Sequence, residues 1–231
     1  MTGTLTAVFL SVLAFVGGHF LLSWRPVRGR IAGAIGEPAF SAVYSVLMVL
    51  ILVWVVAAYR VAPPLVLWDL GRWVNVVPIV AMPFALMLAT AGLASRNPTA
   101  VMGERILEKG LPVARIFTVT RHPFLAGAAL WALAHLLANG DAASVMLFGG
   151  MTVLSIGGMA AIDAKRAFKL GAAWQEFAAK TSRMPLGAAL AGRTQVDWIG
   201  IGVTRPLIGL ILYVVLYMFH DRLFGVPVFV G

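Results

Sequence analysis

Histidine is the residue type in this chain with the widest range of chemistry, and its four copies lie in or beside apolar segments. They are His19, His122, His135 and His220. Two of them belong to one run, TRHPFLAGAALWALAHLLANGD, which covers residues 120–141. An ionisable side chain within a membrane is costly to bury without a partner, so each imidazole is a hypothesis for a functional site.

Helical geometry limits which histidines can act together. His122 and His135 are thirteen residues apart, which separates them by ~20 Å along a helix and points them about 140° apart. No two histidines are spaced i, i+4, so the H-E-x-x-H type of zinc site is unsupported. The chain has no cysteine, which excludes thiolate ligands and covalent haem attachment. Histidines from different helices, on two sides of a noncovalent haem, remain the fitting metal site.

Each histidine also has a structural interpretation, and the residues alone leave both open. His122 precedes Pro123 and could simply begin a helix. His135 could donate to a backbone carbonyl, and His19 follows two glycines that allow a close approach. His220 stands beside charged residues, which favours a hydrogen-bonded role at the membrane interface.

Other catalytic patterns are not supported. Five acidic residues are scattered singly near the membrane boundaries, which argues against paired-carboxylate catalysis; they are Glu37, Asp69, Asp141, Asp163 and Asp197. No nucleophile elbow, P-loop or dinucleotide fingerprint is present. The glycine pairs predict close helix packing; they are Gly17-Gly18, Gly149-Gly150 and Gly157-Gly158.

Composition predicts the elements that must position these residues. The 231 residues are 61% hydrophobic and 12% charged, whereas a soluble domain is nearer half apolar and one quarter charged. The apolar blocks predict an all-α polytopic membrane protein, with one domain over residues 1–231 and about six transmembrane helices. The expected spans are Leu5–Ser23, Ala39–Tyr59, Trp73–Ala94, Pro123–Ala138, Ala142–Ile162 and Pro206–Phe224.

The basic residues predict the orientation. Fifteen of the 18 Lys and Arg residues fall in the loops after the first, third and fifth spans. The positive-inside rule then places these loops in the cytoplasm and both termini on the other side. We therefore attribute the net charge of +9 to topology and exclude nucleic acid as a partner.

Two cytoplasmic segments are long enough to fold. A short polar helix is expected around Met102–Lys109. The segment Asp163–Arg193 alternates basic residues with Phe168, Trp174 and Phe177, which predicts a basic amphipathic helix whose aromatic side chains enter the membrane interface. It could alternatively cover a site that opens to the cytoplasm.

The motifs together resemble the NnrU family of bacterial membrane proteins, which includes the zeta-carotene isomerases. The run T-R-H-P-F-L-A-G…W-A-L-A-H-L-L-A-N-G-D resembles the family signature. Four further segments extend the similarity over nearly the whole chain; they are Gly18–Ser23, Ile35–Phe40 (where Pro38 replaces an arginine), Asp163–Arg193 and Phe219-His220.

The resemblance implies a haem b held by two histidines and a cis–trans shift of a double bond in a linear polyene. By motif position the metal ligands and catalytic residues are His19 and His135, and we add His122, His220, Trp131 and Asn139 as candidates for cofactor binding. The two ligands would differ in depth by ~15 Å if both helices cross upright. The family's association with nitrite and nitric oxide metabolism implies an alternative, a haem-containing accessory or electron-transfer protein.

A second resemblance competes with the first. R-H-P followed by the Asp163–Pro185 segment is similar to the cofactor-binding half of isoprenylcysteine-type membrane methyltransferases. There His122 and this segment would hold S-adenosylmethionine, although one of the family's paired glutamates is missing here, at Ile162. The partners expected under the first resemblance are the lipid bilayer of a bacterial inner membrane and an apolar substrate such as a carotenoid, and homo-oligomerisation is left open.

Overall fold

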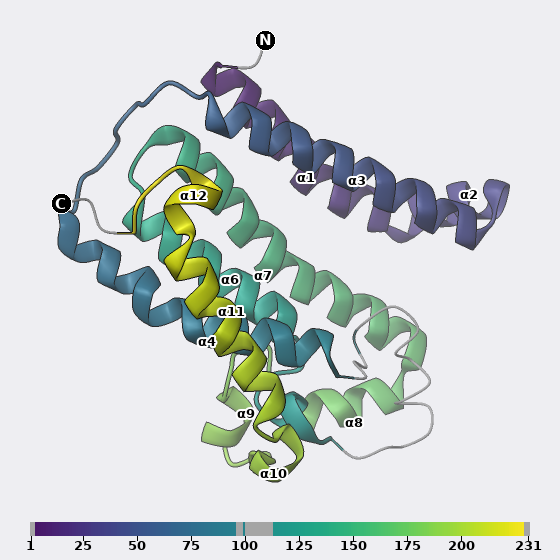
Figure 1. The fold of residues 1–231 in the computed structure, drawn as a ribbon. Coiled ribbons are helices and arrows are strands. Elements are labelled where there is room, and N and C mark those ends of the chain that lie inside the picture. Colours follow the sequence, from purple (N-terminus) through teal and green to yellow (C-terminus); the bar gives the residue numbers. More distant parts are fainter. Residues whose placement is uncertain (1–2, 96–98, 100–112, 229–231) are drawn as a thin grey trace. The chain divides into compact units, whose positions relative to one another are not determined.

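The computed structural model describes residues 3–95, 99 and 113–228, and all of its regular elements are helical. Figure 1 shows their order along the chain. The expected polar helix around Met102–Lys109 lies outside the described residues. The all-α prediction is confirmed for the part of the chain that the structure describes.

Within the described residues, four helical segments are long and apolar enough to cross a membrane. They are α1 (Leu5–Ser23), α3 (Glu37–Arg60), Arg72–Leu93, which joins η1 (Arg72–Asn75) to α4 (Val76–Leu93), and α7 (Ala142–Leu170). Two shorter apolar helices are α6 (Pro123–Ala138) and α11 (Thr204–Met218). By the length and composition of its helices, the chain is a multi-pass membrane protein.

Two of the expected spans end at clearly different residues in the structure, and one helix was not expected. The fifth helix, α7, continues to Leu170 instead of ending at Ile162, because residues 163–170 keep helical hydrogen bonding after the apolar block has ended. The sixth span is broken: α11 ends at Met218, and α12 (His220–Phe224) follows separately. A further helix, α2 (Arg25–Ile35), occupies the first basic loop, with a proline in its first turn.

The chain divides into two compact units, and α6 and α7 run through both of them. Unit 1 comprises Met1–Leu70 and His135–Leu154. Unit 2 comprises Gly71–Ala134 and Ser155–Gly231. Each of the two units is described below by itself.

In unit 1, α1 and α3 form an antiparallel pair that packs on the start of α7. The close approaches use the glycines that the sequence singled out: a Cβ on Gly18 would lie 3.1 Å from Met48, and one on Gly150 would meet Val12. Tyr59 Oη lies 2.8 Å from Ser144 Oγ and so joins the end of α3 to the start of α7. The packing prediction holds at one glycine of each of these two pairs, since Gly17 and Gly149 face open space.

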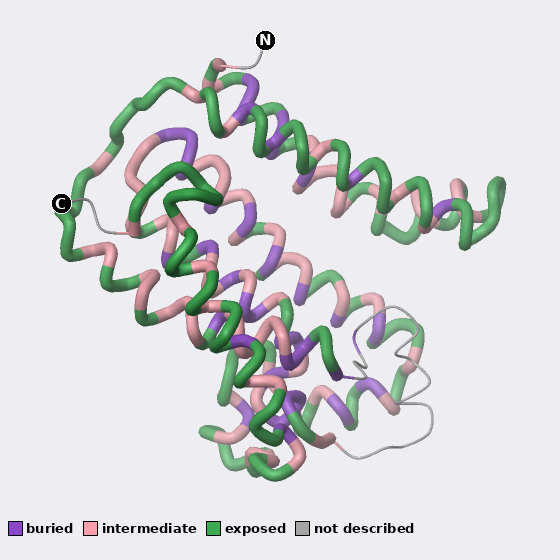
Figure 2. Tube along the Cα trace, in the orientation of Figure 1, coloured by how far each residue is buried: buried purple, intermediate pink, exposed green. Residues whose placement is uncertain are grey.

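The outer surface of α3 is apolar and exposed along most of its length (Figure 2). Large side chains there, such as Val46, Leu50 and Val53, are each about 60% exposed. Because no aqueous protein could leave such a long apolar surface uncovered, this face is suited to lipid.

In unit 2, α4 packs against both α6 and α11. A Cβ on Gly127 of α6 would lie 2.4 Å from the carbonyl oxygen of Ala85, and one on Gly209 of α11 would lie 2.7 Å from the backbone of Met87. Tyr213 Oη donates to the Ile79 carbonyl oxygen at 3.1 Å. Helices that approach this closely exclude side chains from the crossing point, so glycine is required there.

The aromatic residues of the second basic segment face the protein, which corrects the expected membrane contact. After α7, the chain turns at Gly171 and forms α8 (Ala172–Lys180). Trp174 and Phe177 are buried there and pack with Val113 and Leu170. Only Phe168, which is 71% exposed, fits the expected aromatic contact with lipid.

Candidate functional site

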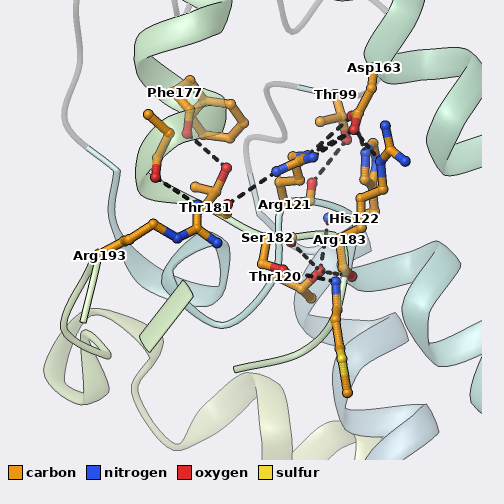
Figure 3. A network of polar contacts seen from close by, with 12 residues as sticks. Thr99, Thr120, Arg121, His122, Asp163, Phe177, Thr181, Ser182, Arg183 and Arg193 are labelled. Atoms are coloured by element: carbon orange, nitrogen blue, oxygen red, sulfur yellow. Dashed lines mark hydrogen bonds and ion pairs between the residues drawn. The ribbon is translucent and has the colours of Figure 1, made fainter. Parts of the chain in front are cut away.

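Two groups of residues could carry function, and the first is a buried ion network in unit 2 (Figure 3). Asp163 of α7 is its centre. Arg121 donates to Asp163 from Nη2 at 2.7 Å and from Nε at 3.1 and 3.2 Å. His122 donates from Nε2 to Oδ1 at 2.6 Å, and Arg183 donates from Nε to Oδ2 at 2.5 Å.

The network is almost closed to solvent on one side. The side chains of His122, Asp163 and Arg121 are 1%, 7% and 12% exposed, whereas that of Arg183 is 49% exposed. A buried carboxylate is stable only when cations or hydrogen-bond donors compensate for its lost hydration. Asp163 therefore fixes the positions of the three side chains around it.

Local sequence brings these side chains together. Pro123 begins α6, and Thr120, Arg121 and His122 form a non-helical lead-in to the helix. The Thr120 hydroxyl donates to the carbonyl oxygens of Ser182 and Arg183 at 3.1 and 2.8 Å. The backbone N–H of Arg121 also donates to the Ser182 carbonyl oxygen, at 2.9 Å.

A third arginine, Arg193, ties the same backbone turn to α8. Arg193 donates from Nη1 to the carbonyl oxygens of Ala179 and Thr181, at 2.7 and 3.1 Å, and Arg121 Nη1 reaches that of Thr181 at 3.2 Å. The expected neighbourhood of Arg121-His122-Pro123 and the Asp163–Arg193 segment is confirmed. Sequence reasoning did not assign the central role to Asp163, although a lone carboxylate beside a basic segment was the available signal.

The geometry of the network favours a structural role over cofactor binding. In the methyltransferase interpretation, His122 and the segment that begins at Asp163 would present polar atoms to S-adenosylmethionine. Here His122 Nε2 and both Asp163 oxygens are bound to partners within the protein. Among the described residues, only Nδ1 of His122 in this network is buried without a hydrogen-bond partner.

The second group lies in unit 1, around His19 on α1. The Nδ1–H of His19 donates to the Phe15 carbonyl oxygen at 2.8 Å. Its ring also makes edge contacts with the rings of Phe15 and Tyr44, with centroids 4.5 and 5.7 Å apart. This hydrogen bond directs Nε2, the nitrogen that ligates metals most readily in this tautomer, away from the backbone of its own helix.

Tyr44 is a neighbour of His19 that sequence reasoning missed. It lies on α3, half-buried, and its ring stacks on that of Phe40 with centroids 6.1 Å apart. Arg28 of α2 lies 4.6 Å above the Phe40 ring and pairs with Glu37. A hydroxyl-bearing ring in an apolar span was the signal that could have identified it.

His135 belongs to the same unit as His19. Its ring packs on that of Phe148, with centroids 5.2 Å apart and planes tilted by 34°. Asn139, another candidate, donates from Nδ2 to the His135 carbonyl oxygen at 2.8 Å and so closes the end of α6. This contact makes Asn139 a helix-terminating residue.

The packing of α1 on α7 gives the difference in level between His19 and His135. The two helices run in the same direction, and Val12 and Val16 of α1 meet Gly150 of α7. His19 is three to seven residues beyond this contact, whereas Phe148, the residue that His135 touches, is two residues before it. At 1.5 Å per residue, His19 and His135 are offset by ~8–13 Å along the helices.

The remaining candidates lie elsewhere. His220 of α12 donates from Nδ1 to the Val226 carbonyl oxygen at 2.8 Å and packs on Phe224, as expected for a hydrogen-bonded interfacial residue. Trp131 is half-buried on α6. No cluster of three or more His, Cys, Asp or Glu side chains that could hold a metal ion occurs within residues 3–95, 99 and 113–228.

The donor set fits haem better than a bare metal ion. Metal-ligating histidines generally donate their other ring N–H to a carbonyl or carboxylate, which is the arrangement at His19. The described residues of this unit offer two separated imidazoles but no group of three donor side chains that could hold a bare metal ion. A porphyrin supplies four ligands itself and would need only the two imidazoles.

Comparison with known proteins gives one match. A family model described as NnrU protein matches residues 7–228, which is nearly the whole chain. No curated protein matches the chain. No solved structure matches it either.

Proposed function

The chain belongs to the NnrU family, and we propose that it binds haem b and catalyses the cis–trans isomerisation of a linear polyene in the membrane. His19 and His135 are the residues that would hold the haem iron. The observation that carries the proposal is the hydrogen bond from His19 Nδ1 to the Phe15 carbonyl oxygen, which orients the ring for ligation through Nε2. The resemblance of the chain to the zeta-carotene isomerases supplies the reaction class.

The surroundings of the two histidines support apolar chemistry. Phe15, Tyr44 and Phe148 contact their rings, and no carboxylate is among the contacts described for His19. A cis–trans shift leaves the substrate's formula unchanged and needs no resident acid–base pair. When bound, haem would supply an iron centre able to weaken a double bond.

The protein's own residues would act through position and exclusion of water. The carbonyl oxygen of Phe15 holds the His19 ring, and Phe148 packs against the His135 ring. Helical register fixes the level of each ring within unit 1. Because the surfaces of α1 and α3 are apolar, a polyene would enter from the lipid without losing hydration.

The methyltransferase alternative has less support. It needs polar atoms of His122 and Asp163 to face a cofactor, and these atoms bind each other and two arginines. An accessory haem protein remains the second candidate, because the same two ligands would serve it equally. A substrate assay separates this candidate from the isomerase.

An absorption spectrum of the purified, detergent-solubilised protein tests haem binding. After expression with haem supply, we expect a Soret band and, after reduction with dithionite, sharp α and β bands typical of two imidazole ligands. His19→Ala and His135→Ala should each abolish this six-coordinate spectrum. His220→Ala, which alters a surface hydrogen bond, is the matched control and should leave it intact.

Two results would contradict the assignment. A preparation without haem would exclude the proposed function as a whole. Loss of the spectrum in the His220 variant but not in the His19 variant would show that the ligands are wrong. If haem binds as expected, conversion of a cis-carotene to its trans form by the reduced protein distinguishes an isomerase from an accessory protein.

A further inference from the structure

The segment between α8 and α11 exposes large apolar side chains although it spans no membrane. It contains two short helices, α9 (Gly187–Leu190) and α10 (Trp198–Ile201). Leu190 is 82% exposed, Trp198 71%, Ile199 96% and Val203 80%. Large apolar residues gathered on an exposed surface mark a site of interaction with a protein or a membrane.

These side chains belong to an ordered element. The Asp197 carboxylate accepts hydrogen bonds from the backbone N–H groups of Gly200 and Arg115, each at 2.8 Å. The backbone N–H of Asp197 donates to Thr118 Oγ1 at 3.0 Å. The two backbone donors, that of Arg115 first, lower the pKa of the Asp197 carboxyl. α10 is thus fastened to η2 (Arg115–Thr118) and holds Trp198 and Ile199 outward.

The length of the next helix places α10 near the membrane. α11 begins at Thr204, directly after Val203, and has 15 residues. It is therefore about 22 Å long, which is less than the ~30 Å of a hydrocarbon core. Residues at its ends must cover the difference or the bilayer must thin, and Val203, Ile199 and Trp198 are the exposed apolar residues at its first end.

The charges around α10 are mainly positive. Arg115 and Arg193 are exposed, and Arg205 lies at the start of α11. Asp197 is the one acidic residue in the sequence from 183 to 205, and backbone N–H groups already bind its carboxylate. Exposed apolar side chains combined with an excess of arginines are typical of segments that bind anionic membrane surfaces.

We propose that residues 187–203 form a membrane-surface anchor, which inserts Trp198, Ile199 and Val203 at headgroup level and binds anionic phospholipid through the arginines around α10. The anchor replaces α8 as the segment that contacts the interface, since the aromatic residues of α8 face the protein. It is independent of haem and of the proposed catalytic activity. A protein partner on the same surface is the competing occupant.

The absence of cysteine allows a direct test with single-cysteine variants of the full chain. Ile199→Cys is labelled with bimane and reconstituted into vesicles that contain phosphatidylcholine and phosphatidylglycerol. Brominated forms of either lipid, at equal mole fraction, quench the fluorophore on contact. Leu50→Cys on α3 is the control for contact with lipid, and Gln175→Cys on the exposed face of α8 is the control for water.

We expect both brominated lipids to quench Ile199→Cys and Leu50→Cys but not Gln175→Cys. Brominated phosphatidylglycerol should be preferred about fivefold at Ile199, the ratio that corresponds to the attraction of one basic side chain to an anionic leaflet. Leu50→Cys, which lies within the span, should show no preference. Arg115→Gln, whose structural contact is through its backbone N–H, should lower the preference at Ile199.

Two outcomes would overturn the proposal. A label at Ile199 that behaves like the one at Gln175 would place α10 in water or beneath another protein. Equal quenching by the two lipids at Ile199 would remove the anionic headgroup as the ligand. Quenching of the Leu50→Cys variant, reconstituted in parallel into the same vesicles, shows that the protein enters the bilayer correctly.

Discussion

Replacing Asp163 by Asn should be one of the most destabilising single changes at the polar end of unit 2. The substitution keeps the size of the side chain but removes the charge that Arg121 and His122 share. It also turns an amide N–H₂ group toward guanidinium donors. Because the side chains of Arg121 and His122 are 12% and 1% exposed, they cannot recover their hydration without opening the structure.

The magnitude follows from the burial of each pair. Breaking a buried ion pair by removing one partner costs about 3–5 kcal/mol of unfolding free energy, and the two buried partners of Asp163 place it in this class. The contact with Arg183 adds little, since that side chain is 49% exposed and exposed pairs contribute about 0–1 kcal/mol. We therefore expect Asp163→Asn to cost about 3–5 kcal/mol and Arg183→Gln less than about 1 kcal/mol.

Unfolding in mixed micelles with increasing dodecyl sulfate measures this difference. Tryptophan fluorescence is a suitable signal, because Trp174 is 3% exposed in the adjoining α8. Glu176→Gln, which removes an exposed pair with Lys180, is the matched control and should not change the transition measurably. Arg121→Gln combined with Asp163→Asn should cost less than the sum of the two single changes, because the buried Arg121 guanidinium is then no longer left without its carboxylate.

Equal stability of Asp163→Asn and Arg183→Gln would refute the reasoning. It would mean that water reaches the carboxylate and that the network does not hold α6 to α7. Additive effects of the Arg121 and Asp163 changes would refute the pairing itself.

Two further predictions concern single backbone contacts. Gly127→Ala should lower the unfolding free energy by about 1–3 kcal/mol, because its Cβ would lie 2.4 Å from the Ala85 carbonyl oxygen. Gly29→Ala, with open space around it in α2, should instead raise the unfolding free energy by about 0.5–1 kcal/mol. Unfolding of both variants in mixed micelles checks this contrast. The lowered pKa of Asp197 means that its contribution is complete above the ordinary pKa of ~4 and is lost as the pH falls through the lower folded value. A spin label on Ile199→Cys should therefore become mobile only in strong acid, whereas in Asp197→Asn it should be mobile at neutral pH; equal mobility in both at neutral pH would contradict this.

The apolar blocks made the helices predictable, and the residues that end them were predictable only in part. α1 and α6 have the expected bounds because Arg25-Pro26, just after Trp24, and the pair Asn139-Gly140 stop the apolar pattern abruptly. The end of α7 was missed because helical hydrogen bonds continue through Asp163 after hydrophobicity has ceased. Membrane solvation limits the length of an apolar block, whereas backbone hydrogen bonding limits the length of a helix.

The direction of side chains in the basic segment could not be obtained from its pattern. Trp174 and Phe177 are three residues apart, which places them on one face of α8. The same spacing fits a face turned to lipid and one turned to protein. The contact with Val113 and Leu170 decides between them, and neither of these residues belongs to α8.

The histidines show which part of the candidate site was predictable. Geometry along one helix was enough to exclude a shared metal at His122 and His135, and the structure assigns these residues to different compact units. The partner of His122 is Asp163, which sequence reasoning had placed near it without recognising the bond. His19 and His135 belong to one unit, with a smaller offset than the ~15 Å expected for upright helices, because α1 contacts α7 at Gly150.

The hydrogen bonds that the histidines make separate those with a structural role from those that remain candidates for metal ligation. His122 Nε2 is bound to Asp163, and His220 Nδ1 is bound to the chain's last described turn. His19 makes its side-chain hydrogen bond within its own helix, so that bond helps to hold no other part of the protein. An imidazole in an apolar helix is costly to retain without a partner, and the ring of Tyr44 is the contact described for His19 on another helix. Ligation of a metal through Nε2, as proposed above, would offset that cost.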